Sequence, residues 1–196
     1  MGAICPVPGI DSVMLNTIER TIIKPTFDGL VRDRLCYKGV LYFGLMITSQ
    51  GPKLLEYNVR FGDPETQVVL PLLKGDFGDL CQTLVQEKLK DYTPAYSSCS
   101  ALGIVIASGG YPGTYKTDKP VEPIPQFPEE DVLVFHSSTR INRDNRIVTG
   151  GGRCFTVVGL GENLLNANKK AYEAAAKVNF EGSFYRSDIG KRFFLE

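Results

Sequence analysis

The stretch Leu54–Leu73, "LLEYNVRFGDPETQVVLPLL", places several ionic and amide side chains between two apolar segments. Apolar and polar residues alternate up to Arg60, as in a β-strand, so Glu56 and Asn58 are expected to share one face of that strand. A carboxylate and an amide oxygen two residues apart suit a hard cation such as Mg²⁺, which also takes water and substrate phosphate oxygens. Arg60, expected on the same face, could pair with a carboxylate or a phosphate.

The same spacing also fits a surface strand with a solvated polar face that ends in an Asp63–Pro64 turn. A Glu-x-Asn triplet is common by chance, so the triplet alone does not decide between a metal site and a solvated face. The opposite face of the strand is mostly apolar and is predicted to face a core. This second face comprises Lys53, Leu55, Tyr57 and Val59.

The charge balance of the chain excludes binding classes that depend on bulk charge. Lys plus Arg equals Asp plus Glu, at 22 each in 196 residues, so nucleic acid and anionic membranes are not expected partners. No apolar run reaches the roughly 20 residues of a membrane span. The start, "MGAICPVPGIDS", lacks the regions of a signal peptide, which favours a cytoplasmic location. The five cysteines form no CxxC and are predicted to be buried free thiols in a reducing compartment.

The first half of the chain predicts helices around one strand pair. A helix is expected over residues 12–23, with Pro25 ending or kinking it, and "TFDGLVRDRL" could add a short second helix. "YKGVLYFGLMITSQGPKLLEYNVRF" indicates two strands joined by the turn "SQGP". Residues 66–89 are predicted to be helical, with Pro71 early and Gly75 and Gly78 as interruptions.

The second half is richer in strand patterns, beyond a loop expected at residues 93–100. Strands are predicted at "ALGIVIAS", "VLVFHSSTRI", "RIVTGGG" and "RCFTVVGLG", followed by a helix over residues 162–178. The proline-rich residues 116–131 are expected to form a crossing loop. The fold class is therefore α+β, with one domain over residues 1–97 and a β-rich domain over residues 98–196.

Other polar residues have a structural interpretation beside the functional one. His136, the one histidine, stands at a strand end without a Ser or Cys partner motif, so a structural role is favoured over catalysis. "GGYPG" and "TGGGR" are not Walker A loops and are expected to be tight turns, although Arg153 could face a substrate. Lys169 and Lys170 are expected on a solvated helix face.

The stretch "RFGDPETQ" resembles the signature of glycinamide ribonucleotide synthetase, the phosphoribosylamine–glycine ligase family of the ATP-grasp superfamily. The resemblance runs through the whole chain. Segments similar to the family occur in family order, namely "KGVLYFGLMIT", "GPKLLEYNVRFGDPETQVVLPLL", "IASGGYPGTY", "VFHSST", "TGGGRCFTVVGLG" and "FEGSFYRSDIG". This number of ordered matches makes the solvated-strand interpretation the weaker one.

The resemblance implies an ATP-dependent carbon–nitrogen ligase of purine biosynthesis. Glycine and 5-phosphoribosylamine would be joined by way of a glycyl phosphate, with ATP as the phosphate donor. Glu56 and Asn58 match the family residues that hold Mg²⁺ or Mn²⁺ on the ATP phosphates. Arg60 and Asp63 would be catalytic, and Gly2, Arg60, Gly62 and Asp63 would contact substrate.

The resemblance also implies that the chain is the C-terminal portion of the synthetase, with part of an ATP-grasp lobe followed by the β-rich domain. "MGAICPVP" is similar to the tail of a family substrate loop, so Met1 is expected to be internal to a longer enzyme, and Ile4 departs from the family's aromatic residue there. The missing N-terminal part or fused purine-pathway domains would be partners. We expect the chain to be inactive alone. The alternative is a non-catalytic module that binds a complementing partner.

Overall fold

The computed structural model describes residues 1–127 and 130–194 and mixes helices with antiparallel strands. The chain forms two compact units that interleave along the sequence. The sheet unit comprises Met1–Pro6, Asp63–Lys74 and Ala95–Glu196, and the hairpin unit comprises Val7–Gly62 and Gly75–Pro94. These units describe packing, whereas the boundary predicted after residue 97 concerned the domains of the family, so that boundary stays a prediction.

The sheet unit is built on four antiparallel strands. Their order is β1 (Gly2–Cys5), β6 (Ser100–Ala107), β10 (Arg153–Gly161) and β7 (Val132–His136). The two central strands are buried along almost their whole length, as their apolar sequences predict. The sequence did not predict β1, because four residues with a glycine and a cysteine carry no strand pattern.

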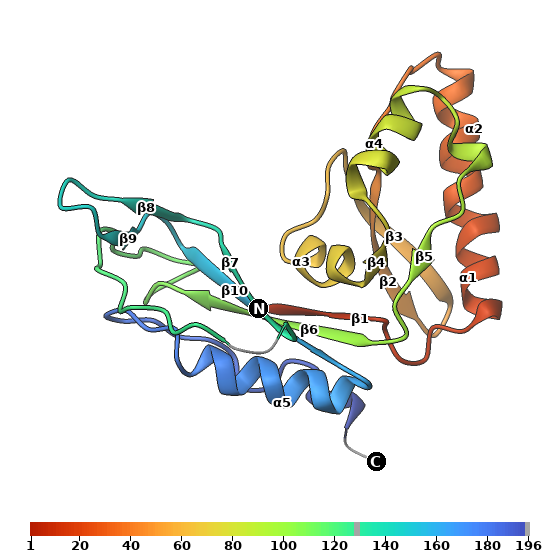
Figure 1. Cartoon of the computed structure of the whole chain (residues 1–196). Helices are drawn as coiled ribbons and strands as arrows, with labels where there is room; N and C mark the ends of the chain where they lie inside the picture. The colour runs from red at the N-terminus through yellow and green to blue at the C-terminus, as the bar shows by residue number, and fades with distance from the viewer. Residues whose placement is uncertain (128–129, 195–196) are drawn as a thin grey trace. The chain divides into compact units, whose positions relative to one another are not determined.

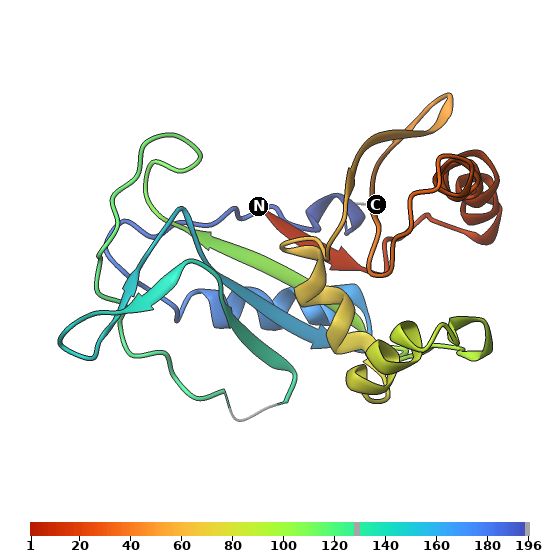
Figure 2. The same ribbon diagram turned by 90° about the horizontal axis from the view of Figure 1, so that it is seen from above.

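Helices cover both faces of this sheet. On one face α5 (Leu164–Ala175) packs against Leu102, Ile104 and Phe155. On the other face lie α3 (Glu65–Val69) and the 3₁₀ turn Leu70–Leu72, whose Val68 and Leu72 pack on Ala101 and Val158. Figures 1 and 2 show α5 running along the sheet on the side away from α3. The sheet unit is therefore a three-layer structure around one strand core.

Small residues bring α5 very close to β10. Ala167 and Ala171 of the helix are completely buried. A Cβ atom at Gly159 would lie 2.3 Å from the Ala167 carbonyl oxygen and 2.5 Å from the Ala171 amide nitrogen. The helix begins at Leu164, within a turn of its predicted start, and the Asn163 side chain caps it by accepting a hydrogen bond from the Asn166 amide at 2.9 Å.

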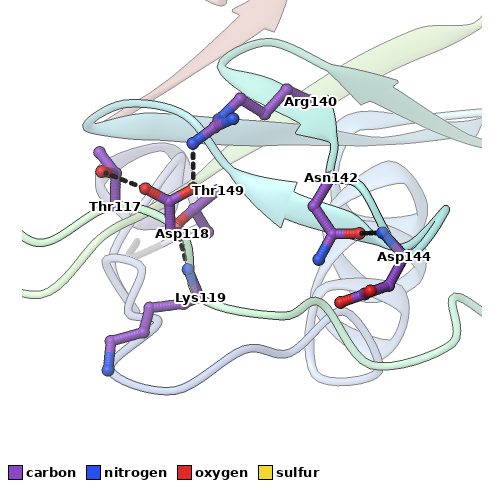
Figure 3. Close-up of polar contacts among 7 residues, drawn as sticks. All are labelled: Thr117, Asp118, Lys119, Arg140, Asn142, Asp144 and Thr149. Carbon is purple, nitrogen blue, oxygen red and sulfur yellow. Dashed lines mark hydrogen bonds and ion pairs between the residues drawn. The ribbon is translucent and has the colours of Figure 1, made fainter.

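The proline-rich segment crosses the sheet unit as an irregular strap over its described residues. It forms single β-bridges with β9 (Ile147–Thr149) through Pro120 and with Phe180 through Val121. Asp118 forms an ion pair with Arg140 of β8 (Thr139–Ile141), the strand paired with β9 (Figure 3). The crossing loop was predicted, but its side-chain anchors were not.

Two buried threonines of this unit differ in hydrogen bonding. Thr149 Oγ1 accepts a hydrogen bond from the Lys119 amide at 3.1 Å (Figure 3), whereas Thr156 Oγ1 has no partner among the described residues. Both side chains are fully buried. We expect Thr156→Val to raise the free energy of unfolding by about 1 kcal/mol, because it removes an unsatisfied hydroxyl at constant shape.

The matched control is Thr149→Val, which also replaces a hydroxyl by a methyl group but removes a hydrogen bond. We expect it to lower the free energy of unfolding by about 1 kcal/mol, since it leaves the Lys119 amide without its acceptor. Urea denaturation of the two variants measures both changes. Equal destabilisation by the two substitutions would contradict the unsatisfied hydroxyl at Thr156.

In the hairpin unit, one continuous helical segment runs from α1 (Ser12–Ile18) through a π-helical turn (Glu19–Ile23) into α2 (Lys24–Arg32). Pro25 was predicted to end or kink the helix, and the prediction that it ends the helix is wrong. The Lys24 amide bonds to the Glu19 carbonyl five residues back, and this wider turn precedes the proline ring.

The two strands predicted around "SQGP" are confirmed as β2 (Tyr42–Thr48) and β3 (Gly51–Asn58), an antiparallel pair. The predicted core face of β3 is wrong for this chain. Leu55 is 64% exposed, Tyr57 47% and Val59 68%. The pair is a two-stranded ribbon, so it lacks the second layer that an apolar face needs for burial.

The single helix predicted over residues 66–89 is also wrong. After α3 and the turn that contains Pro71, the chain forms the short strand β4 (Leu73–Lys74), and a separate helix α4 (Phe77–Val85) follows. Pro71 cannot continue the hydrogen-bonding pattern of α3. Gly75, with φ of 98°, turns the chain. β4 pairs with β5 (Ala95–Tyr96), inside the predicted loop. Further 3₁₀ turns are Leu89–Asp91 and Lys191–Phe193.

All five cysteines are free thiols, but their burial varies. Cys154 is buried, whereas Cys36 and Cys81 are exposed, so the prediction of buried thiols is wrong for those two. Burial raises the pKa of the Cys154 thiol, against the opposing effect of hydrogen bonds with Ser108 and the Gly151 carbonyl. Within residues 1–127 and 130–194, no helix has the length and apolar character needed to cross a membrane.

Candidate functional site

Glu56 and Asn58 lie side by side on β3, as the sequence predicted. The Asn58 side-chain amide Nδ2 donates a hydrogen bond to Glu56 Oε1 at 3.2 Å. The Glu56 side chain is exposed and Asn58 is half-buried at the end of the strand. The pair offers a carboxylate and an amide oxygen at one point on the strand, a donor set that fits Mg²⁺ or Mn²⁺.

The described part of the chain contains no group of three or more His, Cys, Asp or Glu residues that could hold a metal ion. Glu56 and Asn58 would thus supply a minority of an octahedral shell. The remaining positions would fall to water or to oxygens of a bound substrate. The pair is suited to a cation shared with a phosphate rather than to a closed structural site.

Gly44 of β2 makes room for the Glu56 side chain. The two residues are opposite each other in the strand pair, and a Cβ atom at Gly44 would lie 2.9 Å from Glu56 Cγ. Immediately beside them the register shifts between Gly44 and Leu45, so Leu55 is an extra residue in β3. Such bulges re-aim neighbouring side chains. The sequence patterns gave Gly44 no part in the site.

Arg60 and Gly62 follow β3 and do not extend the strand. β3 ends at Asn58, so the prediction that Arg60 continues its polar face is wrong. The Arg60 guanidinium Nη1 instead donates to the Phe61 carbonyl at 2.8 Å. Gly62 is buried, and Asp63 begins the next segment of the sheet unit. Arg60, Gly62 and Asp63 thus lie in the segment that connects β3 to α3, which we call the signature turn.

Asp63 is held by two side chains of the sheet unit. Arg153, the first residue of β10, donates from Nη1 to the Asp63 carbonyl at 2.8 Å, and its Nη2 lies 3.1 Å from Asp63 Oδ2. Gln67 Nε2 donates to Asp63 Oδ1 at 2.9 Å. Sequence reasoning gave Arg153 a minor place and did not single out Gln67. Arg153 is 90 residues away, beyond local patterns.

These three residues line a cavity of about 590 Å³ in the sheet unit. Its wall also includes Tyr111, Tyr115, His136, Ser137, Ser138 and Gly152. A Cβ atom at Gly152 would lie 2.3 Å from the Tyr111 ring, so the "TGGGR" loop packs closely here. His136 Nδ1 and Thr139 Oγ1 are 2.8 Å apart, which gives the histidine a structural contact.

The other predicted residues lie elsewhere in the sheet unit. Gly2 pairs with Ile104, and a Cβ atom there would lie 2.4 Å from the Gly103 carbonyl oxygen. Lys170 forms an ion pair with Asp131 and its side chain is 30% exposed, so the predicted solvated face does not hold for it. Lys169 is 75% exposed, as expected.

Comparison with known proteins identifies the same family from two parts of the chain. The model described as "Phosphoribosylglycinamide synthetase, ATP-grasp (A) domain" matches residues 1–66. The model described as "Phosphoribosylglycinamide synthetase, C domain" matches residues 101–192. The biotin carboxylase domain of a 2-oxoglutarate carboxylase is 12% identical with a TM-score of 0.68 over 94% of the chain and 41% of that domain, a likeness of fold alone.

Named relatives agree with the family models. The chain is 44% identical to the phosphoribosylamine–glycine ligase of Caldanaerobacter subterraneus, over 96% of this chain and 45% of the relative. It is also 44% identical to the trifunctional purine biosynthetic protein adenosine-3 of Gallus gallus, over 98% of this chain and 19% of that protein. The phosphoribosylamine–glycine ligase structure from Thermotoga maritima is 35% identical with a TM-score of 0.79, over 96% of this chain and 46% of that one.

The chain thus spans less than half the length of the relatives to which it is similar. The α+β fold class and the ATP-grasp relationship expected from the sequence are confirmed. With two family models, a relative at 44% identity and a solved structure in agreement, the chain belongs to the phosphoribosylglycinamide synthetase family.

Proposed function

We propose that this chain carries the cation-binding pair and the signature turn of a phosphoribosylamine–glycine ligase. The observation that carries the proposal is the contact of 3.2 Å between Asn58 Nδ2 and Glu56 Oε1, which brings both side chains to one point. The reaction would join glycine to 5-phosphoribosylamine and convert ATP to ADP and phosphate. Mg²⁺ or Mn²⁺ bound there would neutralise phosphate charge.

The proposed chemistry divides into two transfers. The glycine carboxylate attacks the γ-phosphorus of ATP, and ADP leaves with the electron pair of the broken bond. The amine of phosphoribosylamine then attacks the glycyl carbon, phosphate leaves, and the amine loses a proton. Neither transfer needs a covalent nucleophile from the protein, so positioning and charge stabilisation dominate. We propose that Arg60, Gly62 and Asp63 form the turn beside the reacting groups, with Gly2 in a further substrate contact.

A hybrid ligase tests the function. In it, residues 1–196 of this chain replace the matching part of the Caldanaerobacter ligase. The hybrid is expected to release ADP in a manner that depends on both glycine and phosphoribosylamine. The isolated chain is expected to release none, because two oxygen ligands hold a cation weakly without a bound nucleotide. A hybrid that folds with a sharp unfolding transition yet shows no such turnover would overturn the proposed activity.

A second candidate is a non-catalytic module that binds a complementing protein, and the hairpin unit favours it. Val13, Leu15, Val31, Leu55 and Val59 are each more than half exposed. Exposed apolar side chains mark an interaction surface where they form a contiguous patch. Under this alternative the isolated chain would bind a partner while the hybrid lacks turnover, so the hybrid assay separates the two candidates.

Gly44→Ala tests the placement of Glu56 without changing a cation ligand. The added methyl group would lie within 2.9 Å of Glu56 Cγ, so the carboxylate must shift. We expect the Mg²⁺ concentration for half-maximal ADP release by the hybrid ligase to rise about tenfold. Gly29→Ala is the control, because a Cβ atom at Gly29 meets nothing within 4 Å. An unchanged Mg²⁺ requirement in Gly44→Ala would argue against a cation at Glu56.

A further inference from the structure

We propose that Arg153 is a positioning residue, which acts through Asp63 to hold the signature turn in the geometry that the ligase reaction requires. The proposal rests on the proposed function and adds a role for a residue outside the signature. Its basis is a three-residue cluster of Arg153, Asp63 and Gln67, which we call the turn clamp. The clamp joins β10 to the beginning of α3 within the sheet unit.

The backbone around Arg153 is arranged to aim its side chain. The register of β10 against β6 shifts between Arg153 and Phe155, so the strand contains a bulge directly after the arginine. Just before it, Gly152 packs against the Tyr111 ring, and a Cβ atom at Gly151 would lie 2.4 Å from Ser138 Oγ. A bulge on one side and close packing on the other fix the direction in which the guanidinium leaves the strand.

The guanidinium makes a forked contact with Asp63. One nitrogen binds the backbone carbonyl and the other lies beside the carboxylate, at 2.8 Å and 3.1 Å. This geometry fixes main chain and side chain of Asp63 together, which a lysine ammonium on a flexible stem does less well. The side chains of Arg153 and Asp63 are 32% and 37% exposed, so the pair is partly shielded from water.

Gln67 completes the clamp, but only in an orientation that leaves its own amide oxygen without a hydrogen-bond donor in the described part of the chain. Its Nε2 donates to Asp63 Oδ1, and its Oε1 is buried with no hydrogen-bond partner among the described residues. An amide turned the other way would present oxygen to the carboxylate and lose that bond. A buried acceptor without a donor is destabilising. The orientation adopted is therefore the one that restrains Asp63.

The clamp uses both carboxylate oxygens of Asp63 and its carbonyl. Such a carboxylate is suited to anchoring the turn rather than to exchanging protons with substrate. We accordingly assign Asp63 an anchoring role in place of the catalytic one expected from sequence. The residues that contact substrate would be its neighbours in the turn, and Arg153 would set their position from outside it. Small displacements of positioned groups cost large factors in rate.

A double-mutant cycle in the hybrid ligase tests the clamp. Arg153→Gln and Asp63→Asn are each expected to lower kcat/KM about 100-fold. The kcat/KM of the double variant should lie no more than about threefold below that of either single variant, because the two residues act as a unit. The kcat/KM of Arg153→Lys should be less than about tenfold above that of Arg153→Gln, since lysine keeps the positive charge but cannot make both contacts with Asp63. The KM for ATP should stay within about twofold while kcat falls.

The control is Arg140→Gln, which breaks an exposed Arg–Asp ion pair of the same unit (Figure 3). It is expected to leave kcat/KM unchanged. Losses in Arg153→Gln and Asp63→Asn that multiply in the double variant would overturn the proposal, as would unaltered kcat/KM in Arg153→Gln. A loss that matches the fall in folded fraction, measured by the unfolding midpoint, would also overturn it, because the role would then be merely structural.

A readout without turnover separates failure of this proposal from failure of the proposed function. In the isolated chain, Arg153→Gln is expected to shift or broaden the amide NMR signals of Phe61, Gly62 and Glu65, while Arg140→Gln leaves them in place. Unchanged signals in Arg153→Gln would overturn the clamp even in an inactive protein. An inactive wild-type hybrid with the expected signal changes would overturn the ligase assignment and keep the clamp as a restraint on the turn.

Discussion

Glu56→Gln in the hybrid ligase is expected to reduce turnover by at least about 100-fold while the unfolding midpoint changes little. The substitution keeps the size of the side chain and the acceptor for the Asn58 amide, which lies 3.2 Å from Glu56 Oε1. It removes the one negative charge of the pair. The proposed cation loses its charged ligand, and phosphate charge in the transition state is stabilised less. Release of ADP at saturating ATP measures the effect.

Glu19→Gln serves as the control because it removes an exposed carboxylate from the same unit, in the π-helical turn. It is expected to leave turnover within about twofold of the wild-type value. Titration with Mn²⁺ gives a second measure, since a weakened site should require more metal for half-maximal rate. Near-normal turnover in Glu56→Gln at low metal concentration would remove Glu56 from the proposed cation site.

Gly159→Ala is expected to give the largest stability loss among the substitutions considered. The new methyl group would meet backbone atoms of α5 at 2.3 Å and 2.5 Å, and backbone cannot yield as a flexible side chain can. The helix must move away from β10, which opens contacts around Ala167 and Ala171. We expect the free energy of unfolding to fall by about 3 kcal/mol or more. Urea denaturation followed by circular dichroism measures the loss.

Gly150→Ala adds the same methyl group in the same unit at a position with room. The nearest atom to the new Cβ would be the Ser138 carbonyl oxygen at 3.5 Å, an ordinary contact. We expect its free energy of unfolding to change by less than about 0.5 kcal/mol. Equal stability of Gly159→Ala and Gly150→Ala would show that α5 does not rest on the backbone of β10 as described.

Local patterns predicted the elements whose neighbours lie close in sequence. The β2–β3 pair and α5 were found because a turn signal and a helical apolar period are contained within about 20 residues. The expected strands within residues 101–108 and 153–161 were found because both are buried on two faces and carry long apolar runs. The family resemblance, rather than periodicity, supplied the ATP-grasp fold.

The wrong predictions concern segments whose structure depends on contacts with distant parts of the chain. Nothing local shows that a π-helical turn precedes Pro25, or that the chain forms a strand after Pro71. For the site, adjacency of Glu56 and Asn58 followed from strand geometry alone. The turn clamp could not be found in this way, since Arg153 reaches Asp63 across a long stretch of intervening chain.

The pairing of β1 with β6 has a consequence for synthesis on the ribosome. Gly2–Cys5 hydrogen-bond with a strand that begins at Ser100, so the partner is made long after β1 has been translated. At about 5–20 residues per second, the delay over roughly 100 residues is about 5–20 s. During that interval the backbone donors and acceptors of β1 are open to pairing with other chains. Nascent-chain binding by a chaperone would therefore protect this short segment until β6 emerges.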